Sequence, residues 1–300
     1  TFTITVTVNP KPTIANETTS ACSGNLFTVT PVTGGANSNI IASGTTYTWA
    51  IPTVTGGLTG GVLGTAQTSI FGTLTNPTNV PQTATYTVTP ISGSCTGATF
   101  TVVATVNPKP VIPNQTAAIC SGTTFTTSPT NTAPTTIVPS GTTYTWTVAA
   151  NTNVTGQSNQ STPQSSISQT LTNLSNVAQN VVYTVTPTSG DAGNCVGAAF
   201  TLTVTVNPKP FVSTQTTSTC SDSAFTVSPA NGTNSNIVPT GTTYSWSAPV
   251  VTGGLTGGAA GTAQTSITGT LTNPTNVVQT ATYTVTPATS LCTGASFTVT

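Results

Sequence analysis

The sequence predicts an all-β chain built from tandem β-sandwich domains, and three observations support this prediction. Thr makes up about a quarter of the 300 residues, and the β-branched residues Thr and Val favour strands over helices. Short segments alternate apolar and polar residues with a period of two, and clusters of Gly, Pro, Asn and Ser separate them. The same order of motifs returns about every 100 residues.

Charge is nearly absent from the chain, which excludes several classes of function. Only 2% of the residues are charged, and the chain has no His. Nucleic-acid binding needs clustered Lys and Arg, whereas most acid–base catalysis and most metal sites need His or several carboxylates. No apolar run reaches the roughly 18 to 20 residues of a membrane span. We therefore expect no enzyme activity, no cofactor, no nucleic-acid partner and no membrane span in this segment.

Recurring motifs define the repeat and its boundaries. NPKP starts at Asn9, Asn107 and Asn207, with spacings of 98 and 100 residues. GTTY, followed by Thr or Ser and then Trp, keeps nearly the same period, as does YTVTP. The opening segment matches the segments just before the later NPKP motifs. We therefore expect residues 1–8 to be the last strand of a preceding repeat. Complete repeats would follow at 9–106 and 107–206, and a third, with a truncated last strand, at 207–300.

The strands within a repeat follow from the period-two alternation. In the opening TFTITVTV, the apolar residues Phe2, Ile4, Val6 and Val8 share one face and Thr residues take the other. Four further strands of the first repeat are predicted at residues 26–30, 45–49, 69–75 and 83–89. About seven short strands per hundred residues is typical of an immunoglobulin-like β-sandwich.

The six Cys form two series, with one member of each series in every repeat. The spacings within a repeat are 73, 75 and 72 residues. A zinc site needs four closely spaced ligands and a reactive thiol needs a basic neighbour, and the sequence offers neither. We therefore predict one structural disulfide within each domain, and hence an oxidising compartment. The predicted pairs are Cys22 with Cys95, Cys120 with Cys195, and Cys220 with Cys292.

Aromatic residues recur on two predicted strands of each repeat. Each Trp follows a Tyr by two positions, so both rings point to the same face of one strand. One interpretation is a platform on which a sugar stacks, and the other is a core Trp on the third strand of a sandwich. We favour the core for Tyr47, Trp49, Tyr86, Tyr144, Trp146, Tyr183, Tyr244, Trp246 and Tyr283.

A Pro-Lys-Pro segment separates the last strand of each repeat from the next repeat. Proline fixes its own φ angle and restricts the residue before it, so the segment favours a semi-rigid, extended connector. We expect the Lys to be a solvated charge on a stiff linker. The linker residues are Pro10, Lys11, Pro12, Pro108, Lys109, Pro110, Pro208, Lys209 and Pro210.

The three acidic residues do not share a repeat position, which argues against calcium at the joints. Calcium in tandem domains is usually held by several carboxylates, and Glu17, Asp191 and Asp222 belong to different repeats. Asp222-Ser223-Ala224 resembles the short O-glycosylation signal of Bacteroidota, so Ser223 is a candidate site for a glycan.

These motifs together resemble a known family of repeats. TVTVNPKP, Cys-Ser-Gly followed by FTVTP, GTTYTW, YTVTP and a second Cys before the last strand are similar to the PKD-like repeats of long surface proteins in Bacteroidota, particularly flavobacteria. The resemblance covers all three repeats. It implies the stalk of a cell-surface adhesin, such as those of the gliding machinery that the type IX secretion system exports.

The sequence therefore predicts a structural stalk of an extracellular, cell-surface adhesin or filament, whose partners are neighbouring repeats of the same chain. Two alternatives stay open. One is an array of modules that bind a surface glycan through the Trp face or a Gly-rich loop. The other is a subunit that pairs laterally with copies of itself, since its uncharged Thr-rich edge strands lack the charges that usually block pairing. We also expect a fragment with an exposed opening strand to associate end to end.

Overall fold

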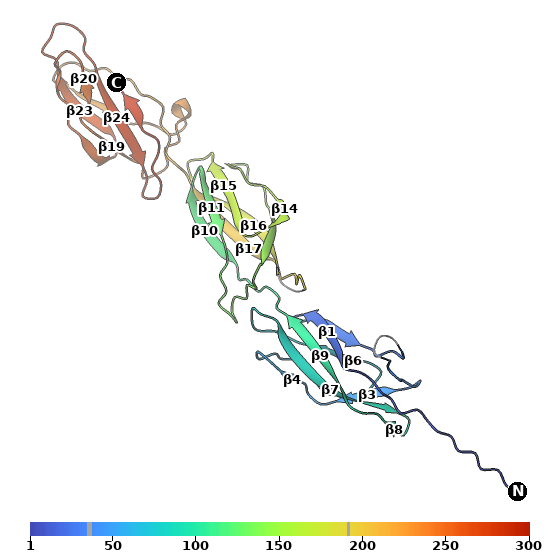
Figure 1. Cartoon of the computed structure of the whole chain (residues 1–300). Helices are drawn as coiled ribbons and strands as arrows, with labels where there is room; N and C mark the ends of the chain where they lie inside the picture. The colour runs from blue at the N-terminus through green and yellow to red at the C-terminus, as the bar shows by residue number, and fades with distance from the viewer. Residues whose placement is uncertain (35–37, 191–192) are drawn as a thin grey trace.

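The chain folds into three β-sandwiches that follow one another in an extended row. The structure is a computed structural model, and it describes residues 1–34, 38–190 and 193–300. The chain starts at one end of the row and ends in the sandwich at the other (Figure 1). Its only helical element is the single 3-10 turn η1 (Thr233–Ser235), within the ranges just given. The all-β, immunoglobulin-like fold class is thereby confirmed.

The described residues of the first sandwich contain nine strands, two of them only two residues long. They are β1 (Glu17–Cys22), β2 (Leu26–Val29), β3 (Thr46–Trp49), β4 (Thr53–Val54), β5 (Gly64–Gln67), β6 (Ile70–Thr73), β7 (Gln82–Ser92), β8 (Cys95–Thr96) and β9 (Phe100–Asn107). One sheet has the order β1-β9-β7-β3-β5, with β4 and β8 also paired to β7, and the other sheet pairs β2 with β6.

The second and third sandwiches repeat this plan. The second has β10 (Gln115–Cys120), β11 (Thr123–Thr127), β12 (Thr143–Val148), β13 (Val154–Thr155), β14 (Gln160–Gln164), β15 (Ile167–Asn173), β16 (Gln179–Thr188) and β17 (Phe200–Asn207). The third has β18 (Ala224–Val227), β19 (Thr243–Trp246), β20 (Val250–Val251), β21 (Thr256–Gly257), β22 (Gly261–Gln264), β23 (Ile267–Thr272), β24 (Ala281–Ala288) and β25 (Phe297–Val299). Their sheets are β10-β17-β16-β12-β14 with β11-β15-β13, and β20-β24-β19-β22 with β18-β23-β21, where β25 pairs with β24.

In the first two sandwiches, the last strand lies between the first strand and the penultimate long strand. β9 pairs in parallel with β1 and antiparallel with β7, and β17 does the same with β10 and β16. Since the first and last strands are parallel, both run from the end of the sandwich where the repeat begins to the end where the next repeat follows. This shared direction fixes which residues meet at a joint.

Each sandwich has its own hydrophobic core, and period-two alternation explains its composition. In β9 and β17 every second residue is buried, from Phe100 to Val106 and from Phe200 to Val206, while the Thr residues between them are half-exposed. The three core clusters lie within residues 14–106, 112–206 and 212–299. The boundaries 9–106, 107–206 and 207–300 remain predictions.

Four predicted strands of the first repeat correspond to strands of the structure, and the assignment of residues 1–8 to a preceding repeat remains a prediction. Residues 26–30, 45–49, 69–75 and 83–89 contain β2, β3, β6 and the middle of β7. Thr1–Val8, by contrast, forms no strand, and its four large apolar residues are 72–87% exposed. The physical reason is that a strand needs a partner for its backbone groups, and within the described residues this segment has none. Asp191 lies outside the described residues.

Candidate functional site: the joints between repeats

Two disulfides cross the joints between neighbouring sandwiches. Cys22 of the first sandwich is bonded to Cys195 of the second, and Cys120 of the second to Cys292 of the third. The Cα atoms of these pairs lie 5.6 and 5.7 Å apart, although 173 and 172 residues separate them in sequence. Cys95 and Cys220 are free thiols. Each disulfide therefore connects the first Cys of one repeat to the second Cys of the next.

This pattern shows that the predicted pairing within a domain is wrong. Cys22 ends β1, whereas Cys95 precedes β9, and these two strands are parallel. The two thiols of one sandwich therefore lie at opposite ends of it. A strand of eight residues rises about 26 Å, and a disulfide needs Cα atoms within about 7 Å. The parallel pair of β10 and β17 separates Cys120 from Cys195 in the same way, and the parallel bridge between Gln215 and Val299 indicates the same for Cys220 and Cys292.

Hydrogen bonds hold the two halves of each disulfide at the joint. Cys22 lies in register with Asn107, the last residue of β9, and the next amide, Ser23 N–H, donates to the Asn107 carbonyl oxygen at 2.8 Å. Across the joint, Cys195 N–H donates to Ser189 Oγ at 2.8 Å, and Ser189 N–H donates to the Cys195 carbonyl at 3.0 Å. Cys195 itself is buried. The disulfide thus joins two locally fixed segments.

The Pro-Lys-Pro linker docks on the repeat that follows it. The second proline of each linker is buried, at Pro12, Pro110 and Pro210. A glycine two residues after the second Cys packs against this proline. A Cβ added at Gly197 would lie 2.4 Å from the carbonyl oxygen of Pro110. Gly97 and Gly294 approach Pro12 and Pro210 in the same way. A Cys-x-Gly motif that recurs in every repeat is the signal in the sequence from which this contact could have been predicted.

A buried asparagine fastens the end of the last strand in the first two sandwiches. Asn76 donates from Nδ2 to the carbonyl oxygens of Val80 and Val106, at 2.8 and 2.9 Å. Asn173 makes the equivalent bonds to Val177 and Val206, at 2.7 and 2.8 Å. Both asparagines are 2% exposed. Their position in the recurring LTN motif was visible in the sequence, but only the structure shows which carbonyl groups they satisfy.

The aromatic residues predicted for the core are all buried, and the indole groups have partners. Trp49, Trp146 and Trp246 are 3%, 5% and 7% exposed. Each Nε1–H donates to a backbone carbonyl oxygen at 3.1 Å. In the first and third sandwiches, the ring also packs against a glycine of the neighbouring edge strand, Gly64 or Gly261. The three indole rings are therefore nearly inaccessible to a sugar.

The remaining predicted positions lie on the surface. Lys11 and Lys209 are exposed and Lys109 is half-buried. Ser223 is exposed in the turn after Cys220, and its glycosylation remains a prediction. Residues 1–34, 38–190 and 193–300 contain no cluster of three or more His, Cys, Asp or Glu that could hold a metal ion. They also contain no helix long and apolar enough to span a membrane.

The disulfides and the strands between them form two covalent threads along the row. From Cys95, 25 residues lead to Cys120, and the disulfide continues to Cys292. Cys22 is bonded to Cys195, and another 25 residues lead to Cys220. The segment from Cys95 to Cys120 includes β8, β9 and β10, so most of it is already extended. Each thread therefore crosses the sandwiches along their first or last strand, and the other strands of those sandwiches lie outside this short covalent path.

These features define a tandem array of immunoglobulin-like sandwiches whose joints are bridged by disulfides. The PKD-like domain family matches the chain three times, over residues 19–110, 117–210 and 217–300. The chain belongs to the PKD-like domain family. A search of curated proteins finds no match.

Solved structures of other tandem arrays resemble the chain at low identity. Titin domains I67–I69 are 9% identical, with coverage of 97% of this chain and 95% of that chain and a TM-score of 0.34. Mouse cadherin-23 EC22–24 is 13% identical, with 97% and 98% coverage and a TM-score of 0.29. A Bacteroides ovatus protein of a mixed-linkage glucan utilization locus, in complex with a heptasaccharide, is 14% identical, with 98% and 68% coverage and a TM-score of 0.18. At such TM-scores these likenesses carry no argument about function.

Proposed function

We propose that the chain is a load-bearing stalk segment of an extracellular surface adhesin or filament, in which disulfides across the joints make the row nearly inextensible. The observation that carries this proposal is the pairing of Cys22 with Cys195 and of Cys120 with Cys292. Stable disulfides form in oxidising compartments, which supports a location outside the cell. The family membership supports a non-catalytic, structural role.

The covalent threads explain how such a stalk resists extension. When the middle sandwich unfolds between two folded neighbours, its chain of about 100 residues is bypassed twice. One short path runs from Asn107 to Cys120 and on to Cys292, and the other runs from Cys22 to Cys195 and on to Pro210. Thirteen residues span at most about 45 Å when fully extended, which is close to the roughly 35–40 Å of a folded sandwich. Unfolding therefore adds almost no length.

Burial of the indole rings favours the stalk over an array of glycan-binding modules. Carbohydrate recognition through stacking needs an accessible aromatic face, whereas all three indole rings are nearly inaccessible and hydrogen-bonded. Lateral pairing between copies stays an alternative, because β5, β14 and β22 are uncharged edge strands.

Single-molecule force spectroscopy on the whole chain, held by its two ends, tests the proposal. In the oxidised chain we expect no large unfolding step, because each sandwich is bypassed. After reduction we expect up to three steps of about 300 Å, since about 100 residues at 3.3–3.6 Å each are released, less the folded length. Steps of that size in the oxidised chain would contradict the proposal.

Two matched variants distinguish the mechanical effect of losing the disulfides from any other effect of the reductant. Cys95→Ser with Cys220→Ser removes both free thiols and leaves the threads intact, so its oxidised curve should match the parent chain. Cys22→Ser, Cys120→Ser, Cys195→Ser and Cys292→Ser together remove both disulfides, so this variant should show the large steps without any reductant. Identical curves for the two variants would exclude a mechanical role for the disulfides.

A further inference from the structure

We infer that the third sandwich has a binding pocket for the acetamido group of a neutral N-acetylated sugar, formed by the hydroxyl of Tyr283 and the backbone of Ala259. The pocket gives one repeat a ligand site, which goes beyond the proposed stalk. The stalk does not depend on the pocket, because that proposal rests on the disulfides at the joints. Differences between the three sandwiches at this one place carry the inference.

The first feature is an open cavity of about 430 Å³ at the edge of the third sandwich. Its wall includes Trp246 of β19, the segment Gly258–Gly261, and residues of β22 and β23. Val285 of β24 pairs with Trp246 on one side and with Phe297 of β25 on the other, so the last strand lies away from this cavity. A volume of several hundred Å³ is typical of sites for small molecules.

The second feature is the side chain that occupies the equivalent place in the second sandwich. Gln169 is the equivalent of Gly269, since each is paired with the Phe of the facing strand. Gln169 Oε1 accepts from the Tyr183 hydroxyl at 2.9 Å and from Ser158 N–H at 3.2 Å. Gln169 Nε2 donates to the Ser158 carbonyl oxygen at 2.8 Å. The second sandwich therefore holds a carboxamide between a phenol and one backbone residue.

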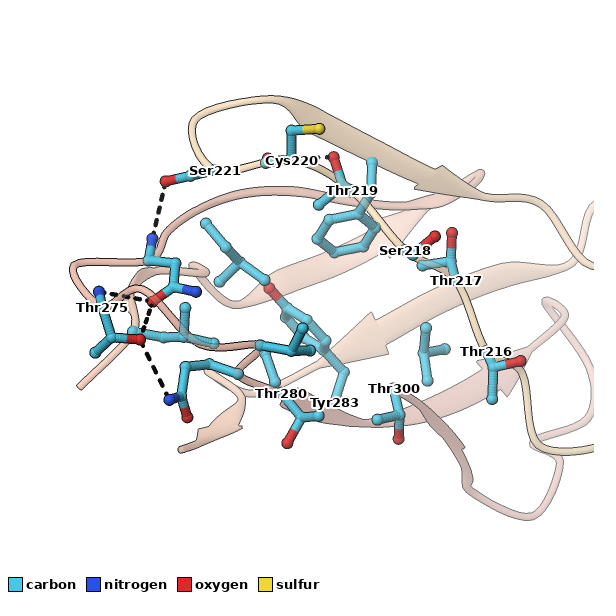
Figure 2. A pocket seen from close by; sticks show the side chains of 18 residues that line it. Thr216, Thr217, Ser218, Thr219, Cys220, Ser221, Thr275, Thr280, Tyr283 and Thr300 are labelled. Atoms are coloured by element: carbon cyan, nitrogen blue, oxygen red, sulfur yellow. Dashed lines mark hydrogen bonds between the residues drawn. The ribbon is translucent and has the colours of Figure 1, made fainter. Parts of the chain in front are cut away.

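The third feature is the phenol of the third sandwich, which has no such carboxamide. Tyr283 is 2% exposed, and its hydroxyl has no hydrogen-bond partner among the described residues. Figure 2 shows its side chain pointing from β24 into the interior of the sandwich. The hydroxyl oxygen lies 2.9 and 3.1 Å from where a Cβ would stand at Gly258 and Gly269, and both glycines line the cavity. It is therefore directed at the place that Gln169 fills in the second sandwich.

In the first sandwich, a side chain of the same sandwich covers this place. Phe71 packs edge-on against Trp49, with ring centroids 6.0 Å apart, and the next residue, Gly72, is buried. The hydroxyl of Tyr86, the equivalent of Tyr283, also has no partner among the described residues, although β9 completes that sandwich. The unpartnered phenol therefore results from the glycine opposite it, and not from the length of the last strand.

Smaller side chains open the cavity in the third sandwich. Thr268 stands where the first sandwich has Phe71, and Ala260 stands where it has Leu63. Gly269 is half-exposed as a result, whereas its equivalent in the first sandwich is buried. Because these residues all belong to the third sandwich, the cavity depends on no other repeat.

The groups around the cavity define how a carboxamide would bind. The carbonyl oxygen of Ala259 accepts from an indole N–H at 3.1 Å, as that of Ser158 does, so Ala259 takes the place of Ser158. A ligand oxygen in the position of Gln169 Oε1 would accept from the Tyr283 hydroxyl and from Ala259 N–H. The ligand N–H would donate to the Ala259 carbonyl oxygen.

The rest of the lining favours a neutral sugar as the carrier of that carboxamide. None of the described residues that line the cavity is charged, so a charged ligand would lose its hydration without compensation. Thr262, Thr268, Thr270 and Gln264 offer hydroxyl and amide groups to the hydroxyls of a sugar. The sugar ring would not stack on the indole of Trp246, which is 7% exposed. An N-acetylated sugar supplies both the carboxamide and the hydroxyls.

Titration of the whole chain with N-acetylglucosamine, followed by nuclear magnetic resonance of the backbone amides, tests the site. We expect saturable shifts centred on Ala259 and Gly269. Glucose lacks the acetamido group and should bind at least about tenfold more weakly, because the buried phenol would stay unpaired. The capped tripeptide Gly-Gln-Gly carries a carboxamide without the sugar hydroxyls and should also bind more weakly. The absence of saturable shifts, equal binding of glucose, or tighter binding of the tripeptide would overturn the proposal.

Tyr283→Phe tests the phenol, and Tyr86→Phe is its matched control in the first sandwich. Tyr283→Phe removes one hydrogen-bond donor to the ligand, so binding of N-acetylglucosamine should weaken by about three- to tenfold. Its stability in urea should not fall, because the hydroxyl has no partner within the chain. Tyr86→Phe should bind like the parent chain. Binding by Tyr283→Phe that equals binding by the parent would overturn the proposal.

A second change closes the cavity without touching the phenol. Ala260→Leu with Thr268→Phe introduces the residues of the first sandwich at two exposed positions, so the shifts should disappear while the fold is kept. Binding that survives this change would equally overturn the proposal. Force curves distinguish this failure from a failure of the stalk, since large unfolding steps in the oxidised chain contradict the stalk whether or not the sugar binds.

Discussion

Cys22 lies in register with Asn107 across the parallel pair of β1 and β9, at the end of the first sandwich that faces the second. Because the linker leaves the sandwich at Asn107, this position directs the Cys22 thiol toward the next repeat. Cys120 and Asn207 repeat the relationship at the second joint. The joints are therefore built from the ends of the first and last strands, and four changes test how they work.

Removal of one whole disulfide should cost the chain much of its stability but leave the folds intact. Cys22→Ser with Cys195→Ser opens a loop of 173 residues, for which the chain-entropy model gives a loss of about 5 kcal/mol. Urea denaturation should show this loss, while circular dichroism before denaturation stays unchanged, because the disulfide lies outside the three cores. Cys95→Ser with Cys220→Ser is the control and should unfold like the parent chain. A loss below about 1 kcal/mol would argue against a disulfide that constrains the unfolded chain.

Gly197→Ala should disturb the docking of the linker. The added Cβ would lie 2.4 Å from the backbone oxygen of Pro110 and 2.9 Å from the Pro187 ring, so the linker has to move. We expect a destabilisation of about 1–3 kcal/mol in urea denaturation of the whole chain. Ala198→Ser changes an exposed neighbour and should stay within about 0.5 kcal/mol of the parent. Equal stabilities for the two variants would show that the linker is free to move away.

Asn173→Ala should be more damaging than the same change at Asn273. Asn173 is buried and donates to Val206 as well as Val177, whereas Asn273 donates to Val277. Loss of the buried amide leaves carbonyl groups without donors, so we expect about 2–4 kcal/mol for Asn173→Ala and about 1 kcal/mol for Asn273→Ala. Hydrogen exchange of the amides of β17, compared with those of β25, measures the difference. Similar protection losses in both strands would contradict the role assigned to the Val206 contact.

Stability should fall at high pH because of the buried tyrosines. Burial raises the pKa of all six Tyr above the ordinary value of 10.0. Since the unfolded chain loses these protons more readily than the folded chain, stability is retained below pH 10 and declines as the pH rises above it. Thermal denaturation of the Cys95→Ser, Cys220→Ser variant should give a level melting temperature up to about pH 9 and a falling one above pH 10. A melting temperature that holds level to pH 12 would contradict buried phenols.

The sequence predicted the fold from local patterns that the structure retains. Alternation at residues 26–30 and 83–89 located β2 and β7, because one face of each strand packs on the core. The first strand, β1, was not predicted, since its residues Glu17–Cys22 are only half-exposed on one face, mostly exposed on the other, and carry little alternation of apolar and polar residues.

The disulfide pairing could not be predicted from the sequence. The first Cys of a repeat is at a regular spacing from the second Cys of its own repeat and also from the second Cys of the next repeat. Cys22 is as regularly placed relative to Cys195 as it is relative to Cys95. Only the parallel direction of β1 and β9 distinguishes the two pairings, and that direction depends on contacts between residues that are far apart in the chain.

Peptide mapping under non-reducing conditions tests the central claim most directly. Digestion with pepsin at low pH keeps thiols protonated and suppresses exchange between disulfides, and mass spectrometry then identifies the joined peptides. The structure predicts one pair that contains Cys22 and Cys195 and another that contains Cys120 and Cys292. Peptides that join Cys22 to Cys95 or Cys120 to Cys195 would contradict it, because they would place each disulfide within a single sandwich and leave the joints without a covalent link.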